Sequence, residues 1–307
     1  MLFSFPEYAY ISKALGDLPD FQPGQFSVTP YGNQELHTSV HSPVSGEQCF
    51  ILGTIAPPAH QMAATLLLAH TLKKQGAKRL TGILPYLAYS REDKMKSGES
   101  LATAWMGSLL KASAFDEIWT VDLHSGQDKT LFPLALESFS PSGLIAACIR
   151  DLGLTDASIV ALDNGAIPRC AAVKSRASMK SGDLVHFEKQ RTASGIVHRG
   201  PIGKVESRAV IVDDILDTGA TLVSGCEKLA RAGVEELHIF VTHGLFTGQA
   251  WKSLWSLPVK RIFCTDTIPA CRDIHDPRIT TLPVGPLLCE KLASLQRNTE
   301  FASLPLE

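Results

Sequence analysis

The chain has 307 residues, of which 45% are hydrophobic, and its formal net charge is −2 with a pI near 6.6. This length and composition can fill the core of one large or two medium domains, so a soluble globular enzyme is the default expectation. The small net charge excludes the electrostatic footprint of a protein that binds nucleic acid or an anionic membrane, and it favours small-molecule partners.

The chain shows no targeting or redox signature. The N-terminal sequence has no basic segment and no long apolar core, and no apolar run reaches the length that spans a bilayer, so we expect no export signal and no membrane segment. The seven cysteines are odd in number and never stand in CxxC spacing, which predicts reduced thiols in a cytoplasmic protein. They are Cys49, Cys148, Cys170, Cys226, Cys264, Cys271 and Cys289.

Strand-like apolar runs alternate with helical stretches along most of the chain, which is typical of an α/β fold with a largely parallel sheet. In the first half, we expect a strand at 49–54, a helix over 66–76 and a strand at 79–86. A later strand should end at Asp122.

The same series of elements occurs again in the second half. A strand at 209–214, a helix over 226–233 and a strand at 236–243 repeat the first three elements, and a strand that ends at Asp266 repeats the one that ends at Asp122. This repetition predicts two similar α/β domains related by duplication.

A segment rich in turn residues, 139–143, separates the two halves. We therefore expect one domain over residues 1–141 and the other over residues 142–307, with the extreme C-terminus able to pack on the first domain. After its first repeated strand, the second copy carries an acidic segment where the first copy has TIAPPAHQ. The two halves should therefore have different uses.

Polar side chains follow strand-like runs at further places in the chain. Arg91, Glu92 and Asp93 follow one run, where an arginine can meet a triphosphate through charge-assisted hydrogen bonds, although a solvated charged loop has the same composition. His124 follows another, and such a histidine is more often a hydrogen-bonded structural residue than a metal ligand. Asp163 follows a third and can simply cap a helix.

Residues 181–207 combine weak apolar patterning with several glycines and basic residues, immediately before the strand at 209–214. We interpret this segment as a mobile flap. Lys189 and Arg191 lie two residues apart, so in an extended segment their side chains leave on the same face and can close over one anionic group. The alternative is an exposed hairpin whose cations contact only water.

The strand at 209–214 opens the most informative stretch of the chain, VIVDDILDTGAT. Its apolar residues show no polar alternation, as in a parallel strand covered on both faces, which puts Asp213 and Asp214 at its carboxyl end. Two carboxylates there can accept hydrogen bonds from sugar hydroxyls or bind a hard cation. The loop that follows should open a helix and offer its N–H groups to a phosphate, with ordinary turn chemistry as the alternative. Its residues are Asp217, Thr218, Gly219, Ala220 and Thr221.

The string VIVDD-x-x-DTGAT closely resembles the 5-phosphoribosyl-diphosphate (PRPP) binding motif of phosphoribosyltransferases and of ribose-phosphate diphosphokinases, the PRPP synthetases. Other segments resemble the diphosphokinase family and stand in family order. PYLAYSRED is similar to its PY-x-x-YARQD, TVDLHSGQ to its VDLH, and EKQR to its KRR. A phosphoribosyltransferase would leave the first domain without a role, so the PRPP synthetase family is the closer match, from about Tyr31 to VGPLLCEKL.

This resemblance implies two phosphoribosyltransferase-like domains, each a largely parallel sheet flanked by helices. The implied activity converts ATP and ribose 5-phosphate into PRPP and AMP. Ribose 5-phosphate would bind to Asp213, Asp214 and the loop residues just named, while Lys189 and Arg191 would stabilise the transferring diphosphoryl group. A non-catalytic regulatory paralogue and a phosphoribosyltransferase are the alternatives.

The resemblance also implies where ATP and Mg²⁺ bind. Arg91, Glu92 and Asp93 take the place of the nucleotide-binding motif, with Glu92 where the family usually has glutamine. YGNQE falls where the family has FSDGE, a segment that reaches the adenine pocket of a neighbouring subunit, so a homo-oligomer, dimer or higher, is implied. The residues of this segment are Tyr31, Asn33 and Glu35, and those near the Mg²⁺ ion would be His124 and Asp163.

Overall fold

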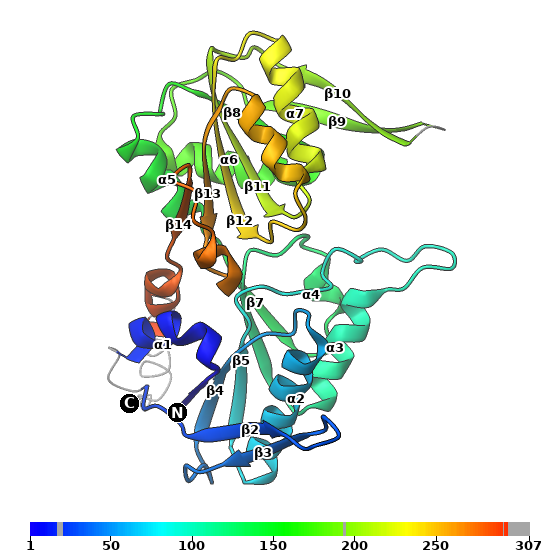
Figure 1. Cartoon of the computed structure of the whole chain (residues 1–307), viewed down its shortest axis with the longest axis vertical. Helices are drawn as coiled ribbons and strands as arrows, with labels where there is room; N and C mark the ends of the chain where they lie inside the picture. The colour runs from blue at the N-terminus through cyan, green and yellow to red at the C-terminus, as the bar shows by residue number, and fades with distance from the viewer. Residues whose placement is uncertain (17–20, 193–194, 291, 294–307) are drawn as a thin grey trace, which may run out of the picture. The chain divides into compact units, whose positions relative to one another are not determined.

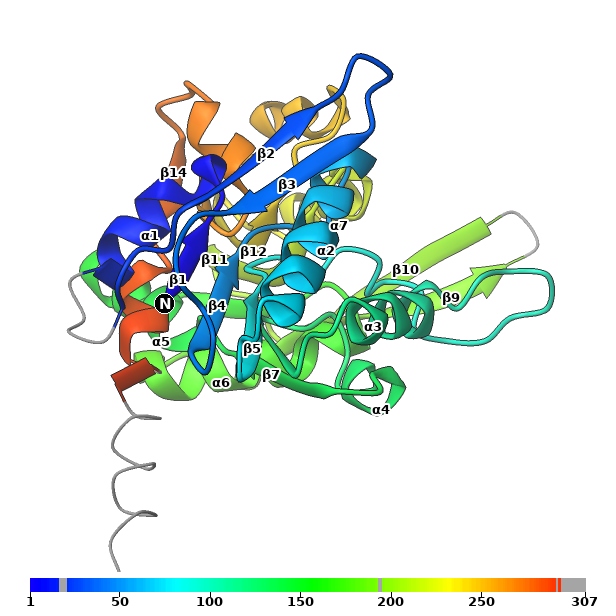
Figure 2. The same ribbon diagram turned by 90° about the horizontal axis from the view of Figure 1, so that it is seen from below.

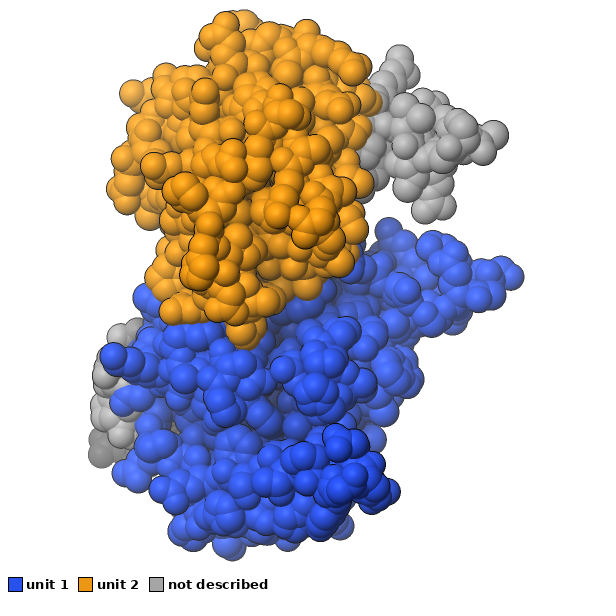
Figure 3. Space-filling model, in the orientation of Figure 1, with its two compact units in different colours: residues 1–139, 284–307 blue, residues 140–283 orange. Residues whose placement is uncertain are grey.

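The computed structural model describes residues 1–16, 21–192, 195–290 and 292–293, with the side chains of residues 189–199 outside that description. The chain forms two compact units, which Figure 3 shows in different colours. Unit 1 comprises Met1–Phe139 and the segment that begins at Val284, and unit 2 comprises Ser140–Pro283. The division between them therefore falls in the turn segment 139–143.

Unit 1 is built on a parallel sheet. Its elements are β1 (Leu2–Ser4), the 3-10 helix η1 (Pro6–Tyr8), α1 (Ala9–Gly16), β2 (Phe26–Pro30), β3 (Leu36–Val40), β4 (Gln48–Leu52), α2 (Ala59–Lys74), β5 (Arg79–Ile83), α3 (Ala102–Ala112), β6 (Glu117–Val121), α4 (Asp128–Leu131) and β7 (Ala135–Phe139). The sheet order is β1-β4-β5-β6-β7, with every neighbouring pair parallel, and Figure 1 labels β4, β5 and β7 of this sheet. A separate antiparallel hairpin, β2–β3, lies beside α2 (Figure 2).

Unit 2 has a longer sheet of the same kind. Its elements are α5 (Ser142–Asp151), β8 (Ser158–Ala161), η2 (Asn164–Ala166), α6 (Ile167–Ala177), β9 (Val185–Thr192), β10 (Gly195–Ile202), β11 (Arg208–Leu216), α7 (Ala220–Arg231), β12 (Glu236–Gly244), η3 (Ala250–Ser256), β13 (Val259–Thr265), η4 (Pro269–Asp273) and β14 (Ile279–Leu282). The sheet order is β10-β9-β8-β11-β12-β13-β14, and only the pair β9–β10 is antiparallel. The α/β class expected from the sequence is confirmed.

The two sheets share one order of neighbours. The strands β8, β11, β12, β13 and β14 succeed one another in unit 2 as β1, β4, β5, β6 and β7 do in unit 1. The sequence repeat matched β4 with β11, β5 with β12 and β6 with β13. The two strands of each pair occupy equivalent positions in their respective sheets. This agrees with the expectation of two similar domains.

Strand β11 is covered on both faces. Ala209 and Ile211 belong to one buried cluster together with apolar residues of α7, whereas Val210 and Val212 belong to a second cluster with apolar residues of α5 and α6. All four side chains are fully buried. Because successive strand residues point to opposite faces, a strand buried on both faces has no polar alternation, and this accounts for the pattern seen in the sequence.

The same strand continues further than the sequence indicated. It ends at Leu216, because β12 offers pairing partners as far as Gly244. Asp213 pairs in register with Val241, so Asp213 and Asp214 lie within the ladder, in the second half of β11, and not after its last residue. The carboxyl groups are therefore held by a fixed backbone.

The segment expected to be a flap forms the antiparallel hairpin β9–β10, which Figure 1 shows as a long ribbon. Val185 and Phe187 at the start of β9 are fully buried, and Val185 pairs with Val160 of β8. The base of the hairpin is therefore part of the sheet of unit 2. Mobility of the outer part stays a prediction.

All seven cysteines are free thiols, and five of them are buried. Burial raises the pKa of Cys148 to about 11, and the negative charge of Asp151 acts in the same direction, so this thiol stays protonated at neutral pH. Within the ranges that the structure describes, no helix combines the length and the apolar character needed to cross a membrane.

Candidate functional site

The second half of β11 carries two adjacent carboxyl groups. Asp214 is 7% exposed, and its backbone N–H donates a hydrogen bond of 3.0 Å to Oδ1 of Asp213. Burial raises the pKa of Asp213 well above its usual range, and the carboxylates of Asp214 and Asp163 act in the same direction. Asp213 and Asp163 are half-buried, so this group of carboxyl side chains suits a ligand that brings hydroxyl donors or positive charge.

Arg169, in the first turn of α6, provides positive charge to this acidic group. Its Nη2 lies 3.9 Å from Oδ2 of Asp214, and the two side chains are 11% and 10% exposed. Its charge also opposes the rise in the pKa of Asp213. Sequence reasoning missed Arg169, although the residue stands just after Asp163 at the start of a helix, because nothing in that segment points to partners on β11.

The loop after β11 ends in a glycine N-cap. Gly219 has a φ of 86°, no side chain caps the helix, and α7 begins at Ala220. The N–H of Val223 donates a helical bond of 2.8 Å to the Gly219 carbonyl oxygen. The N–H groups that precede it have no partner within the helix, so this end of α7 attracts anions. Among the expected loop residues, Asp217 and Thr218 precede the N-cap, and Ala220 and Thr221 form the first turn of α7.

In unit 1, Arg91, Glu92 and Asp93 lie in the loop between β5 and α3. Arg91 and Glu92 are exposed, and Asp93 is half-buried. The Glu92 carboxylate accepts a short hydrogen bond from the Ser100 hydroxyl, and the Glu92 carbonyl oxygen accepts one of 3.3 Å from the N–H of Thr103. Glu92 is thus tied to its own loop through both its side chain and its backbone.

The turn between β2 and β3 brings together Tyr31, Asn33 and Glu35. The Tyr31 N–H donates a bond of 2.7 Å to the Glu35 carbonyl oxygen, and Oδ1 of Asn33 accepts one of 3.2 Å from the Glu35 N–H. The Asn33 side chain therefore helps to build the turn. Tyr31 is 54% exposed, and its hydroxyl lies 3.1 Å from Nδ1 of His37, so an aromatic face stands at the end of the hairpin.

The two residues implied for Mg²⁺ belong to different units. His124 is exposed in the segment after β6 of unit 1, whereas Asp163 follows β8 in unit 2. Oδ1 of Asp163 accepts a hydrogen bond of 3.0 Å from the Ala166 N–H, so Asp163 does cap a helix. Over the described residues, no three His, Cys, Asp or Glu side chains form a group that could hold a metal ion. An ion bound by the Asp163 carboxylate would therefore need further oxygen ligands from substrate or water, which is usual for Mg²⁺.

Lys189 and Arg191 are placed only by their backbone. Both belong to β9, where Lys189 pairs with His198 and Arg191 with Ile196 of β10. Their side chains lie outside the description, so the roles expected of them stay predictions.

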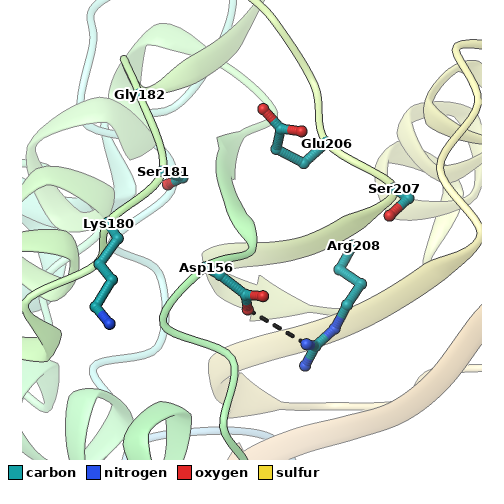
Figure 4. A pocket seen from close by; sticks show the side chains of 7 residues that line it. All are labelled: Asp156, Lys180, Ser181, Gly182, Glu206, Ser207 and Arg208. Atoms are coloured by element: carbon teal, nitrogen blue, oxygen red, sulfur yellow. Dashed lines mark hydrogen bonds and ion pairs between the residues drawn. The ribbon is translucent and has the colours of Figure 1, made fainter.

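A separate pocket lies at the other end of β11. Its lining residues are Asp156, Lys180, Ser181, Gly182, Glu206, Ser207 and Arg208 (Figure 4). Nη1 of Arg208 lies 3.3 Å from Oδ1 of Asp156, and Nη2 donates a bond of 3.1 Å to the Gly153 carbonyl oxygen. These contacts fasten the amino end of β11 to the turn that precedes β8, and the pocket contains none of the expected site residues.

Two family descriptions match most of the chain. "N-terminal domain of ribose phosphate pyrophosphokinase" matches residues 1–113, and "Phosphoribosyl synthetase-associated domain" matches residues 169–304. The first range contains Tyr31 and Arg91, and the second contains Arg169 and Asp214. The residues expected to bind ATP and ribose 5-phosphate therefore lie within the matched ranges, whereas His124 and Asp163 lie between the two ranges.

Similar curated proteins carry the name ribose-phosphate pyrophosphokinase. The one from Hyphomonas neptunium is 26% identical over 300 residues, which cover 96% of each chain. The one from Bacillus subtilis is 24% identical over 307 residues, which cover 99% of this chain and 96% of the relative. A crystal structure of phosphoribosylpyrophosphate synthetase from Mycobacterium smegmatis has a TM-score of 0.85 at 24% identity, covering 97% of this chain and 99% of that one. The fold is therefore shared over nearly the whole chain.

Proposed function

We propose that this chain, which belongs to the ribose-phosphate pyrophosphokinase family, transfers the diphosphoryl group of ATP to the anomeric hydroxyl of ribose 5-phosphate, giving PRPP and AMP. The observation that carries the proposal is the second half of β11, where the half-buried Asp213 and the buried Asp214 stand shortly before a helix N-terminus with a glycine cap. A phosphorylated sugar presents the matching groups, since its hydroxyls donate to carboxylates and its phosphate accepts from N–H groups.

Ribose 5-phosphate binds along this end of β11. Asp213 and Asp214 accept hydrogen bonds from the ribose hydroxyls, and the loop residues Asp217 to Thr221 hold the 5-phosphate with their N–H groups and hydroxyls. Arg169 keeps the Asp214 carboxylate in place by its charge. The substrate thus receives donors and acceptors from a rigid strand and a helix end.

ATP is bound by unit 1. Arg91 meets the polyphosphate, where a guanidinium can make paired charge-assisted hydrogen bonds. Tyr31, with Asn33 and Glu35 in the same turn, serves the adenine of a neighbouring subunit, so the working enzyme is a homo-oligomer, dimer or higher. Glu92 does not oppose the polyphosphate, because Ser100 holds its carboxylate within the loop.

Mg²⁺ is the proposed cofactor, and when bound it neutralises charge on the polyphosphate. Asp163 fits this ion because carboxylate oxygens are the ligands that Mg²⁺ prefers. His124 offers a ring nitrogen, which Mg²⁺ favours less, and its place near the ion rests on the family resemblance. The carboxyl groups of Asp213 and Asp214 stay assigned to the sugar.

In the reaction, the anomeric oxygen of ribose 5-phosphate attacks the β-phosphorus of ATP. The bond from the β-phosphorus to the oxygen that bridges it to the α-phosphate breaks, AMP leaves with that oxygen, and the proton of the anomeric hydroxyl passes to solvent. Lys189 and Arg191 stabilise charge on the diphosphoryl group as it moves. The protein contributes mainly by positioning the reactants and by electrostatic stabilisation.

AMP release tests the proposal. Chromatography of mixtures that contain protein, ATP, ribose 5-phosphate and Mg²⁺ should show AMP only when all components are present. Binding of both substrates without turnover would indicate a regulatory paralogue instead, and consumption of PRPP with a free base and without ATP would indicate a phosphoribosyltransferase. Either result would overturn the proposal.

Ser100→Ala should raise the KM for ATP about tenfold, in line with the loss of one charge-assisted hydrogen bond, and leave the KM for ribose 5-phosphate unchanged. Without the Ser100 hydroxyl, the Glu92 carboxylate can turn toward the polyphosphate and repel it. Ser97→Ala, at an exposed position of the same loop, is the matched control. Steady-state kinetics with each substrate varied in turn would measure both constants, and an equal rise in the two would contradict the assignment of this loop to ATP.

A further inference from the structure

The connection between β12 and η3 lies directly against the loop that follows β11. The N–H groups of Leu245 and Phe246 donate bonds of 2.8 and 3.1 Å to the Leu216 carbonyl oxygen, and the Thr247 N–H donates one of 3.1 Å to the Asp217 carbonyl oxygen. Three consecutive residues thus bind the first part of the loop. We call residues 245–251 the bracing segment.

The far end of the bracing segment contacts the loop at its glycine. A Cβ atom added to Gly219 would lie 2.7 Å from both Cα and Cβ of Trp251. Carbon atoms do not approach so closely, and a backbone atom cannot move aside as the end of a long side chain can. Together with the positive φ of Gly219, this contact requires glycine here. The Cα and Cβ atoms of Trp251 therefore limit how closely the N-cap of α7 can approach η3.

Trp251 is itself held firmly. It is 5% exposed and belongs to the same buried cluster as Leu222 of α7 and Leu254 of η3. Its ring meets that of Phe246 edge to face, with centroids 5.0 Å apart. Gly244 makes room for Phe246, because a Cβ atom there would lie 2.5 Å from its ring. The bracing segment is thus tightly packed, and this packing holds the residues that contact the loop in fixed positions.

We propose that the bracing segment positions the sugar-phosphate loop, and that Trp251 is its positioning residue for ribose 5-phosphate. The loop is held on two sides, at the carbonyl groups of Leu216 and Asp217 and at the Cα of Gly219. Its N–H groups therefore keep one arrangement before the phosphate arrives, and binding needs no reordering of the loop. This inference rests on the proposed function.

A role for Trp251 in core packing alone would explain its burial. It would not explain why three hydrogen bonds of the same segment end on Leu216 and Asp217, nor why the backbone of Trp251 touches Gly219. If the segment positions the loop, a change in it should affect ribose 5-phosphate and spare ATP, which binds to unit 1.

The first test compares substitutions at Trp251 and Trp255. Trp251→Ala should weaken ribose 5-phosphate binding about 10- to 100-fold, the scale expected from a displacement of about 1 Å in a binding group, with little change in ATP binding. Trp251→Phe should recover most of the affinity, and it removes a buried Nε1 that has no hydrogen-bond partner among the described residues. Trp255→Ala is the control for the loss of a neighbouring ring, because Trp255 meets Trp251 edge to face, with centroids 6.4 Å apart, and packs on Arg278, 4.0 Å from its centroid.

A second pair of variants covers the case in which Trp251→Ala does not fold. Gly219→Ala and Gly233→Ala both place alanine at a positive φ, 86° and 93°, one at each end of α7. Only the new Cβ at position 219 would clash with a neighbouring residue, because no atom lies within 4 Å of a Cβ built on Gly233. Gly219→Ala should therefore lose affinity for ribose 5-phosphate, whereas Gly233→Ala should keep it.

Calorimetric titration of each variant with ribose 5-phosphate and, separately, with ATP measures these affinities, with melting temperatures recorded alongside. Tryptophan fluorescence adds an independent signal, since ribose 5-phosphate should change the emission of the wild type and of Trp255→Phe but not that of Trp251→Phe. If the wild-type protein does not bind ribose 5-phosphate, the proposed function fails. If it does, and Trp251→Ala and Gly219→Ala bind equally well or lose both ligands alike, the positioning role is refuted.

Discussion

Lys189→Ala and Arg191→Ala should each lower kcat about 100- to 1,000-fold, the usual effect of removing one donor that stabilises charge in a transition state. The binding of ATP and ribose 5-phosphate should hardly change, because in the proposed mechanism these residues act on the diphosphoryl group only while it moves. Both positions belong to β9 and are separated by one residue, an arrangement that suits joint action on one group.

Gln190→Ala is the matched control, since residue 190 stands between the two cations in the same strand. Its kcat should stay near that of the wild type. Steady-state kinetics beside equilibrium binding would measure all three variants. A normal kcat for Lys189→Ala and Arg191→Ala, or equal damage from Gln190→Ala, would rule out the proposed use of the hairpin.

Arg169→Met should lower the free energy of unfolding by about 3 kcal/mol near pH 8, because removing one partner of a buried ion pair leaves its carboxylate uncompensated. The side chains of Arg169 and Asp214 are 11% and 10% exposed, and the positive charge of Arg169 also acts to lower the pKa of Asp213 beside them. Without Arg169, the positive charge that offsets the effect of Asp214 and Asp163 on Asp213 would be lost. The thermal unfolding transition should move down accordingly.

The loss should shrink as the pH falls. Burial holds the pKa of Asp213 above its unfolded value, so the folded protein keeps a proton that the unfolded chain loses above about pH 4. The contribution of Asp213 to stability is therefore fully present below that pH and decreases as the pH rises toward the folded pKa. Removal of Arg169 raises this pKa further and steepens the decrease.

Unfolding curves at pH 5 and pH 8 would check this prediction, with Arg176→Met at an exposed position of the same helix as control. Adding Asp213→Asn to Arg169→Met should restore much of the stability at pH 8, because an amide requires neither a buried negative charge nor the uptake of a proton on folding. A loss of stability that is the same at both pH values, and that Asp213→Asn leaves unchanged, would show that Arg169 acts through packing alone.

The part of the site that the sequence predicted is the part in which neighbours in the chain are neighbours in space. The apolar run before Asp213 predicts a strand covered on both faces, and the small residues after it predict a helix N-terminus. Both were found, at β11 and α7. The length of β11 was underestimated because the pairing of Leu216 with Gly244 depends on β12, a separate segment of the chain.

The parts that sequence reasoning missed depend on contacts between distant segments. Arg169 meets Asp214 only because α6 and β11 pack against one cluster. Trp251 reaches Gly219 only because η3 lies against α7. Glu92 could not be assigned an orientation until its bond to Ser100 was seen. A local pattern carries no signal for such pairs.

The proposed reaction is tested most directly by ³¹P NMR of a mixture of the protein with ATP, ribose 5-phosphate and Mg²⁺. Attack at the β-phosphorus predicts equal amounts of AMP and of a sugar that carries a diphosphate at C1 and a phosphate at C5. No ADP should accumulate. Formation of ADP with a sugar bisphosphate, or of AMP with free diphosphate and unchanged ribose 5-phosphate, would contradict the account.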